Sequence, residues 1–278
     1  MQDVSAYCTQ LVRTADRDRF LAALFAPAQH RDALYALYAF NVELTRVREA
    51  AREPLPGEIR LQWWSEVIGG VRGDEARANP VASALLAAID RHRLPPAKLL
   101  ALIEAHRFDL YDKAMATLAD LEAYAKKTSS AVIAIAAQIL AGNEMEEVAQ
   151  PAGIACAIVG VLRGFPLHAA RGQLYVPRDI LERHRVLTQD IFAGRSSDGL
   201  AAAIAELRDL GRRYLASTRE AMTSLPDEAL PALLPVALVR PWLERLERSA
   251  PFSPAEISPW RRQWLIWRAA RHPARVAG

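Results

Sequence analysis

Only a few polar side chains of this 278-residue chain have types and spacing that suggest chemistry. Asp109 and Asp112 are three positions apart and could supply one cation site, although solvated charges at a helix end are far commoner. His168 could be a metal ligand or a proton shuttle, but no Cys, His or acidic cluster stands near it, which favours a hydrogen-bonded structural role. Arg163 and Arg171 carry guanidinium groups suited to phosphate, and ion pairing between helices would explain them equally well.

The end of the chain has a second set of residues with informative spacing. A helix starting near Ser258 and Pro259 would carry Trp260, Trp264 and Trp267 on one face, because they recur at i, i+4 and i+7. Four arginines surround that face: Arg261, Arg262, Arg268 and Arg271. Such a helix suits the headgroup layer of an anionic membrane or a partner protein. The alternative is a last helix that packs its tryptophans onto the rest of the protein and leaves its arginines in solvent.

Helices must position these residues, because the apolar period is 3.6 almost everywhere and strand-like alternation is nearly absent. Alanine and leucine fill the helical windows, and proline or glycine separates them, for example at Pro95-Pro96 and Gly142-Asn143. The pattern predicts an all-α, multi-helix bundle in one domain, residues 1–257, followed by the Trp/Arg helix at 258–278. Its apolar stretches fall short of the roughly 20 residues that span a bilayer, so we expect buried core helices.

Composition excludes several classes of protein. Apolar residues make up 51% and charged residues 24% of the chain, as in ordinary globular proteins. The 35 basic and 32 acidic residues give a formal net charge of +3, so no nucleic-acid partner is expected. Cys8 and Cys156 are expected to be buried, reduced thiols. No cleavable signal is visible at the start, so the expected location is the cytoplasm.

Four ordered blocks of the sequence resemble the squalene/phytoene synthase family. They run from Arg31 to Phe40, from Gly57 to Trp64, from Asp120 to Tyr124 and from Ala170 to Asp179. The resemblance implies a single-domain helical bundle of the terpenoid synthase type with a central cavity. Within the last block, Asp179 is placed to cap the helix that follows Pro177.

The catalytic metal site of the family is not preserved at the matching positions. The resemblance implies that aspartates four residues apart on two facing helices would hold magnesium, which pulls diphosphate off a prenyl substrate. The first pair matches Thr45 and Glu49, with Arg46 where a further aspartate often stands, and the second pair matches Gly164 and His168. Glu49 alone cannot hold the magnesium ions. We therefore expect no catalytic residue, metal or other cofactor here, and magnesium only if the chain is an enzyme after all.

The resemblance also implies positions that could bind a prenyl substrate or ligand: Arg31, Tyr38, Arg163, Arg171 and Tyr175. Aromatic side chains at helical spacing are usually plain core. Tyr38, with Tyr35 and Phe40, is therefore expected to be core first, and could line a tunnel for a prenyl chain as well.

The run from Leu162 to Pro177 is similar to a branch of the family that acts in complex I assembly and is thought to lack catalysis. This similarity implies an assembly role, or a related binding role near a membrane, and not an enzyme. The implied partners are membrane-protein subunits of a respiratory complex or its assembly intermediates, with a peripheral position at the inner membrane face. Two alternatives stay open: an active head-to-head prenyltransferase that uses farnesyl or geranylgeranyl diphosphate in isoprenoid biosynthesis, and a protein that binds an isoprenoid lipid without turnover.

Overall fold

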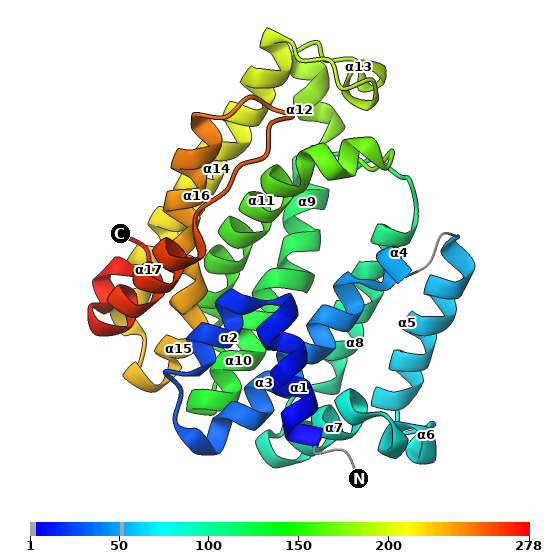
Figure 1. The fold of residues 1–278 in the computed structure, drawn as a ribbon, viewed down its shortest axis with the longest axis vertical. Helices are drawn as coiled ribbons and strands as arrows, with labels where there is room; N and C mark the ends of the chain where they lie inside the picture. The colour runs from blue at the N-terminus through cyan, green and yellow to red at the C-terminus, as the bar shows by residue number, and fades with distance from the viewer. Residues whose placement is uncertain (1–3, 51–52) are drawn as a thin grey trace.

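The computed structural model describes residues 4–50 and 53–278, except for the side chains of residues 49 and 50. Within these residues the chain is helical, and an isolated parallel bridge between Ala114 and Leu174 is the only strand-like pairing. The predicted all-helical single domain is confirmed (Figure 1).

Proline and glycine mark several helix ends as the sequence predicted. Pro80 and Pro96 occupy the first positions of α7 and α8, where the missing N–H costs nothing. Gly142 ends α10 in the left-handed conformation, with φ of 73°. The first half of the chain forms α1 (Val4–Ala15), α2 (Arg17–Ala23), α3 (Ala28–Thr45), α4 (Val47–Ala50), α5 (Pro54–Ile68), α6 (Gly73–Ala78), α7 (Pro80–His92) and α8 (Pro96–His106). The second half forms α9 (Leu118–Ala125), α10 (Ala131–Ala141), α11 (Glu146–Ala170), α12 (Arg178–Arg183), α13 (Thr188–Phe192), α14 (Asp198–Ala221), α15 (Leu230–Leu233), α16 (Val239–Glu247) and α17 (Pro259–Arg271).

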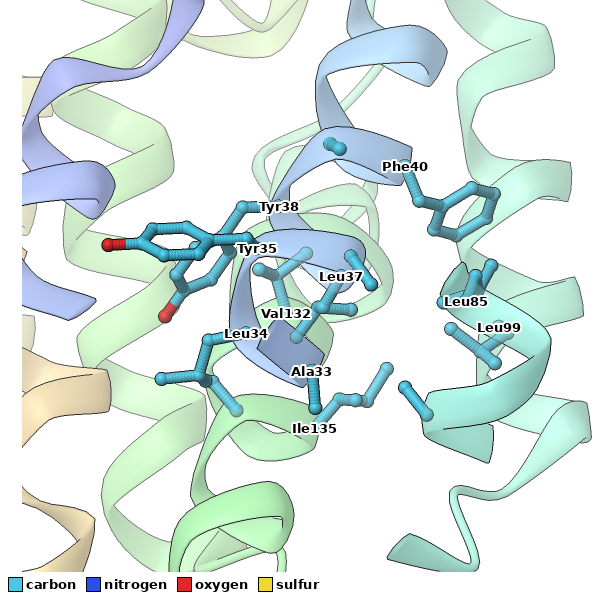
Figure 2. Close-up of a cluster of buried hydrophobic side chains, with 14 of the residues drawn as sticks. Ala33, Leu34, Tyr35, Leu37, Tyr38, Phe40, Leu85, Leu99, Val132 and Ile135 are labelled. Carbon is cyan, nitrogen blue, oxygen red and sulfur yellow. The ribbon is translucent and has the colours of Figure 1, made fainter. Parts of the chain in front are cut away.

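The helix α3 runs through the core and is buried on nearly every side, as its unbroken apolar run from Ala33 to Phe40 requires. Figure 2 shows its side chains together with Leu85 of α7 and Leu99 of α8, which belong to the same cluster. Tyr35, Tyr38 and Phe40 all lie in this cluster, so the expectation that they are core residues is confirmed.

The helix α11 is longer than the apolar stretches in the sequence suggested, because it continues through Pro151 and Pro166. By length and composition it is the one helix among the described residues that could cross a membrane. Most of it is buried in the bundle, where it packs against α10, α14 and α16. Its position is that of a core helix, as expected.

The last helix, α17, is docked on the bundle. Ile266 and Ala269 are fully buried against η5 (Leu234–Leu238) and α2. Arg262 Nε donates to Asp18 Oδ1 of α2 at 2.9 Å, and the second guanidinium nitrogen bonds the other carboxylate oxygen. The division of the chain into a domain at residues 1–257 and a separate terminal segment at residues 258–278 stays a prediction.

Candidate functional site

A cavity of about 320 Å³ lies between the end of α3, the end of α8 and the second half of α11. Its lining includes four of the residues that the family resemblance singled out, Thr45, His168, Arg171 and Tyr175, together with Asp109 and Cys156. The structure therefore brings together one position from each segment that the resemblance matches to a metal motif and two of the positions expected to bind a ligand.

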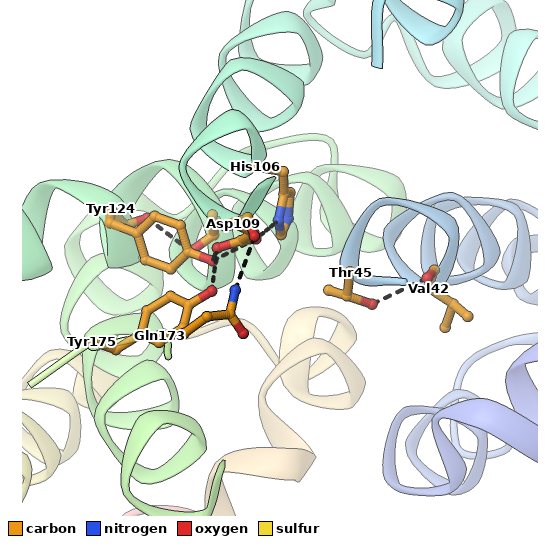
Figure 3. A network of polar contacts seen from close by, with 8 residues as sticks. Val42, Thr45, His106, Asp109, Tyr124, Gln173 and Tyr175 are labelled. Atoms are coloured by element: carbon orange, nitrogen blue, oxygen red, sulfur yellow. Dashed lines mark hydrogen bonds and ion pairs between the residues drawn. The ribbon is translucent and has the colours of Figure 1, made fainter. Parts of the chain in front are cut away.

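Asp109 is the centre of a hydrogen-bond network on one wall of this cavity (Figure 3). Its carboxylate accepts from the Tyr175 hydroxyl at 2.6 Å and from the Tyr124 hydroxyl at 2.9 Å. It also bonds His106 Nδ1 at 2.6 Å. The main-chain oxygen of Asp109 accepts from Gln173 Nε2 at 3.0 Å. Only 14% of the Asp109 side chain is exposed, so the network fixes a nearly buried carboxylate.

Two connecting segments place these groups together. The helix α8 ends at His106 and continues as a 3-10 turn, η1 (Arg107–Leu110), which brings the Asp109 carboxylate beside the His106 ring. The segment after α11 is held alongside the chain that follows η1, because Met115 N donates to Leu174 O at 3.0 Å. Tyr175 is thereby positioned to face η1 from a distant part of the sequence.

Another part of the cavity lining comes from a short π-helix, η2 (Lys126–Ser130), between α9 and α10. Thr128 and Ser129 of this segment line the cavity. A π segment inserts an extra residue per turn and is often found at functional sites. Here it turns two hydroxyl-bearing residues toward the space that Asp109 also borders.

Burial sets the protonation state of the groups around the cavity. Burial and the adjacent Asp109 carboxylate raise the pKa of Tyr124 and Tyr175, so both phenols stay protonated and donate. Burial lowers the pKa of His168 against the opposite effect of Asp109, which keeps this imidazole neutral at pH 7. Burial also raises the pKa of the Cys156 thiol to about 11, so it is no thiolate nucleophile.

The two free cysteines are both thiols, as expected, and Cys8 is buried. Cys156 is only partly buried because it borders the cavity. The nitrogens His106 Nε2 and His168 Nδ1 are buried and have no hydrogen-bond partner among the residues that the structure describes. Two of the residues that line the cavity therefore each have an imidazole nitrogen without a hydrogen-bond partner.

The expectation of solvated helix-end charges is wrong for Asp109 and right for Asp112. The Asp112 side chain is 59% exposed and accepts from Arg48 at 2.9 Å. The two aspartates have different partners and do not form a shared cation site. Asp179 lies in the first turn of α12, and the N-cap position is Pro177, which has no side-chain cap. Its carboxylate accepts from Ile180 N of that turn at 2.8 Å, in part as expected, and also from Leu118 N at 3.2 Å.

Two further positions that the resemblance matches to the metal motifs, Arg46 and Gly164, do not line this cavity. Gly164 precedes His168 by one helical turn, and a Cβ at this position would lie 2.7 Å from His168 Nε2. The small residue therefore lets the imidazole lie back over the helix. Arg46 lines a separate surface groove with Glu43 and Arg60. The side chain of Glu49 lies outside the described residues.

Three other positions expected to bind a ligand do not line the cavity, and their side chains contact other parts of the protein. Arg31 donates to the main-chain oxygens of Leu24 and Ala26, which fixes the turn between α2 and α3. Tyr38 is buried in the core beneath Arg19. The guanidinium carbon of Arg163 lies 3.9 Å from the ring centroid of Trp242 on α16.

Several lining residues were not predicted from the sequence to belong to a site. They include Arg19, Asn41, His106, Tyr124 and Gln173. The spacing of three between His106 and Asp109 at a helix end was the one available signal, and such spacing is too common to be decisive. Their roles depend on contacts between segments that are far apart in the sequence.

The family model for squalene/phytoene synthase matches residues 12–268 of this chain. The chain belongs to the squalene/phytoene synthase family. Human "NADH dehydrogenase (ubiquinone) complex I, assembly factor 6" is 30% identical over 244 residues, which cover 87% of this chain and 73% of that protein. Phytoene synthase from Thermus thermophilus is 28% identical over 285 residues, covering 97% of this chain and 94% of that enzyme.

Solved structures of the family share the fold. A crystal structure of a dehydrosqualene synthase in complex with ligand matches with a TM-score of 0.83 at 18% identity, covering 98% of this chain and 97% of that one. At this identity the likeness shows the shared architecture, and the chemistry must be argued from the residues of this chain.

The described lining does not fit the magnesium that the family resemblance implies. Asp109 is the one carboxylate among the lining residues that the structure describes, and three donors already bind it. Across the described residues, no group of three or more His, Cys, Asp or Glu side chains could hold a metal ion. Arg19, Arg48 and Arg171 add positive charge to the same wall, which disfavours a cation.

Proposed function

We propose that this protein is a non-catalytic member of its family that serves the assembly of respiratory complex I. The observation that carries the proposal is the state of Asp109, the one carboxylate in the described cavity wall. Its oxygens accept hydrogen bonds from Tyr124 and Tyr175 and bond His106. Releasing these donors to make a metal ligand would cost about 1 to 3 kcal/mol for each buried group left unpaired.

The cationic groups of the wall support the same proposal. Arg48 donates to Leu110 O at 3.0 Å and to Asp112, and Arg19 bonds Asp16 at 2.8 Å. Both arginines line the same cavity as Thr45 and His168, so their charges would repel magnesium there. The described part of the wall is thus held by internal hydrogen bonds and presents no arrangement of hard oxygen ligands for magnesium.

The relatives named as complex I assembly factor 6 support the biological role. They match at up to 30% identity across 87% of this chain. On this proposal, the partners are membrane-protein subunits of complex I or its assembly intermediates, and the protein acts from the cytoplasm at the inner membrane face.

The purified protein is expected to release no diphosphate from farnesyl or geranylgeranyl diphosphate in the presence of magnesium and NADPH. Without a metal site, the rate should lie at least about a thousandfold below that of an active synthase. Diphosphate release can be followed with a coupled phosphate assay, with Thermus thermophilus phytoene synthase and geranylgeranyl diphosphate as the active control. Magnesium-dependent release at a rate near that of the control would overturn the non-catalytic part of the proposal.

Deleting the gene in the organism that encodes this chain is expected to lower the amount of assembled complex I at least severalfold. Native gels would measure the assembled complex, and NADH:ubiquinone oxidoreductase activity of membranes would measure its function. Succinate oxidation serves as the matched control, because it does not pass through complex I. A normal amount and activity of complex I in the deletion strain would contradict the assembly role, whatever the diphosphate assay shows.

One observation favours an enzymatic alternative. The match to the Thermus thermophilus phytoene synthase covers nearly the full length of both proteins. A head-to-head prenyltransferase, with magnesium held by residues that include the undescribed Glu49 side chain, would explain that match. The diphosphate assay separates this alternative from the proposal, and saturable binding of a prenyl diphosphate without release would indicate an isoprenoid-binding protein.

A further inference from the structure

The helix α17 turns its three tryptophans away from the bundle. Trp260, Trp264 and Trp267 are 81%, 49% and 47% exposed, whereas Ile266 and Ala269 are fully buried. At about 100° per residue, these two sets of side chains lie on opposite faces of the helix. The alternative in which the last helix packs its tryptophans onto the bundle is therefore wrong.

Specific contacts fix this orientation. Both oxygens of Asp18 accept from the Arg262 guanidinium, which also lies 6.0 Å from the ring centroid of Trp242. Ser258 caps the helix by accepting from Arg261 N at 3.4 Å. Rolling the tryptophans inward would break the Arg262–Asp18 pair and expose Ile266. The outward face is thus a stable property of the fold, and three exposed tryptophans in a row call for a partner.

The charged residues of α17 itself are all positive. From residue 258 to the end of the chain there are five arginines and no acidic residue, while the rest of the chain has thirty basic and thirty-two acidic residues. The guanidinium carbon of Arg268 lies 4.5 Å from the ring centroid of Trp264, and that of Arg271 lies 5.5 Å from that of Trp267. Aromatic and cationic groups are therefore interleaved along one surface.

Neighbouring helices extend the positive surface. Gln263 lies next to Trp267 around the helix, at the edge of the tryptophan face. It lines a groove with Arg13 of α1 and Arg17 of α2, which are both exposed. The apolar ridge of α17 is thus flanked by basic side chains from two other elements. An anionic surface that covered α17 would meet these arginines as well.

We infer that the outward face of α17, made of Trp260, Trp264 and Trp267 with Arg261, Arg268 and Arg271, docks on the surface of an anionic phospholipid bilayer. The helix would lie parallel to the membrane, with its indole rings at the headgroup level and its guanidinium groups on lipid phosphates. The helix has 13 residues, so this face is at most about 20 Å long, and its arginines match the negative charge of anionic headgroups. This inference is independent of the proposed role in complex I assembly.

The test uses the purified full-length protein with vesicles of phosphatidylcholine, alone or mixed with phosphatidylglycerol. The protein is expected to sediment with the mixed vesicles and to release as salt concentration rises. The triple variant W260A/W264A/W267A should lower the partition coefficient at least about tenfold. The variant R261Q/R268Q/R271Q should also weaken binding and remove most of its salt dependence. Substitution is preferred to deletion of α17, because deletion would also expose the surfaces of η5 and α2 on which Ile266 and Ala269 pack.

Matched controls separate membrane binding from general stickiness and from misfolding. Leu55 and Ile59 are exposed apolar residues on α5, and the variant L55A/I59A should bind mixed vesicles as the unchanged protein does. The triple tryptophan variant should keep its thermal unfolding midpoint, because the altered side chains are exposed. No binding to mixed vesicles, equal binding to phosphatidylcholine alone, or full binding by the triple tryptophan variant would each overturn the inference. Loss of self-association in that variant, without vesicle binding by the unchanged protein, would assign the face to a second copy of the chain instead.

Discussion

Replacing Gly153 with alanine is expected to destabilise the protein by at least about 3 kcal/mol. Gly153 lies in the middle of α11, where the helix crosses η2, and a Cβ there would overlap the N and Cα atoms of Ser130. Neither main chain can yield easily, because Ser130 Oγ also donates to Gln150 O at 2.9 Å. The crossing supports the cavity wall formed by Thr128 and Ser129. Urea unfolding followed by far-ultraviolet circular dichroism would measure the loss.

Gly160 provides a matched control on the same helix. A Cβ at Gly160 would meet no atom within 4 Å. Gly160→Ala is therefore expected to stabilise the protein by about 0.4 to 1 kcal/mol, because alanine restricts the unfolded chain and favours the helix. If both substitutions changed the stability equally, helix propensity and not the close approach to Ser130 would determine the effect of Gly153→Ala.

Much of the fold could be predicted from the sequence because local signals determine it. The proline starts of α7 and α8 and the glycine end of α10 follow from backbone restrictions that act within a few residues. The length of α11 could not be predicted in the same way. Its two internal prolines are tolerated because packing against α10, α14 and α16 outweighs the lost main-chain hydrogen bonds.

The candidate site was harder to predict because tertiary contacts create it. Thr45, His168, Arg171 and Tyr175 were identified by resemblance, and the structure places them around one cavity. The role of Asp109 depends on Tyr124 and Tyr175, which lie 15 and 66 residues away in sequence. No local pattern predicts such a network.

The last helix illustrates a different limit of sequence reasoning. The spacing of its tryptophans predicts that they share a face, but it does not say which way that face points. The burial of Ile266 and Ala269 on the opposite face and the Arg262–Asp18 pair decide the direction. Hydrophobic periodicity alone would have turned the larger residues inward.

Replacing Asp109 with alanine is expected to lower the free energy of unfolding by about 3 to 5 kcal/mol. The substitution leaves the hydroxyls of Tyr124 and Tyr175 and the Nδ1 of His106 without their shared partner in a nearly buried place. Asp112→Ala is the matched control: its carboxylate is exposed and its partner Arg48 keeps Leu110 O, so about 0 to 1 kcal/mol is expected. Chemical unfolding of the two variants would measure the difference.

A double-mutant cycle would show that unpaired donors cause this loss. In the Asp109→Ala background, Tyr175→Phe removes a hydroxyl that no longer has its carboxylate partner, so it should cost less than the same change in the unaltered protein. A coupling free energy of about 1 to 3 kcal/mol is expected for this pair, because each stranded donor is buried. Additive effects, or equal losses for Asp109→Ala and Asp112→Ala, would mean that the network does not hold the cavity wall and that Asp109 is free to serve as a ligand. The cycle therefore decides between a structural carboxylate and a functional one, on which the non-catalytic proposal depends.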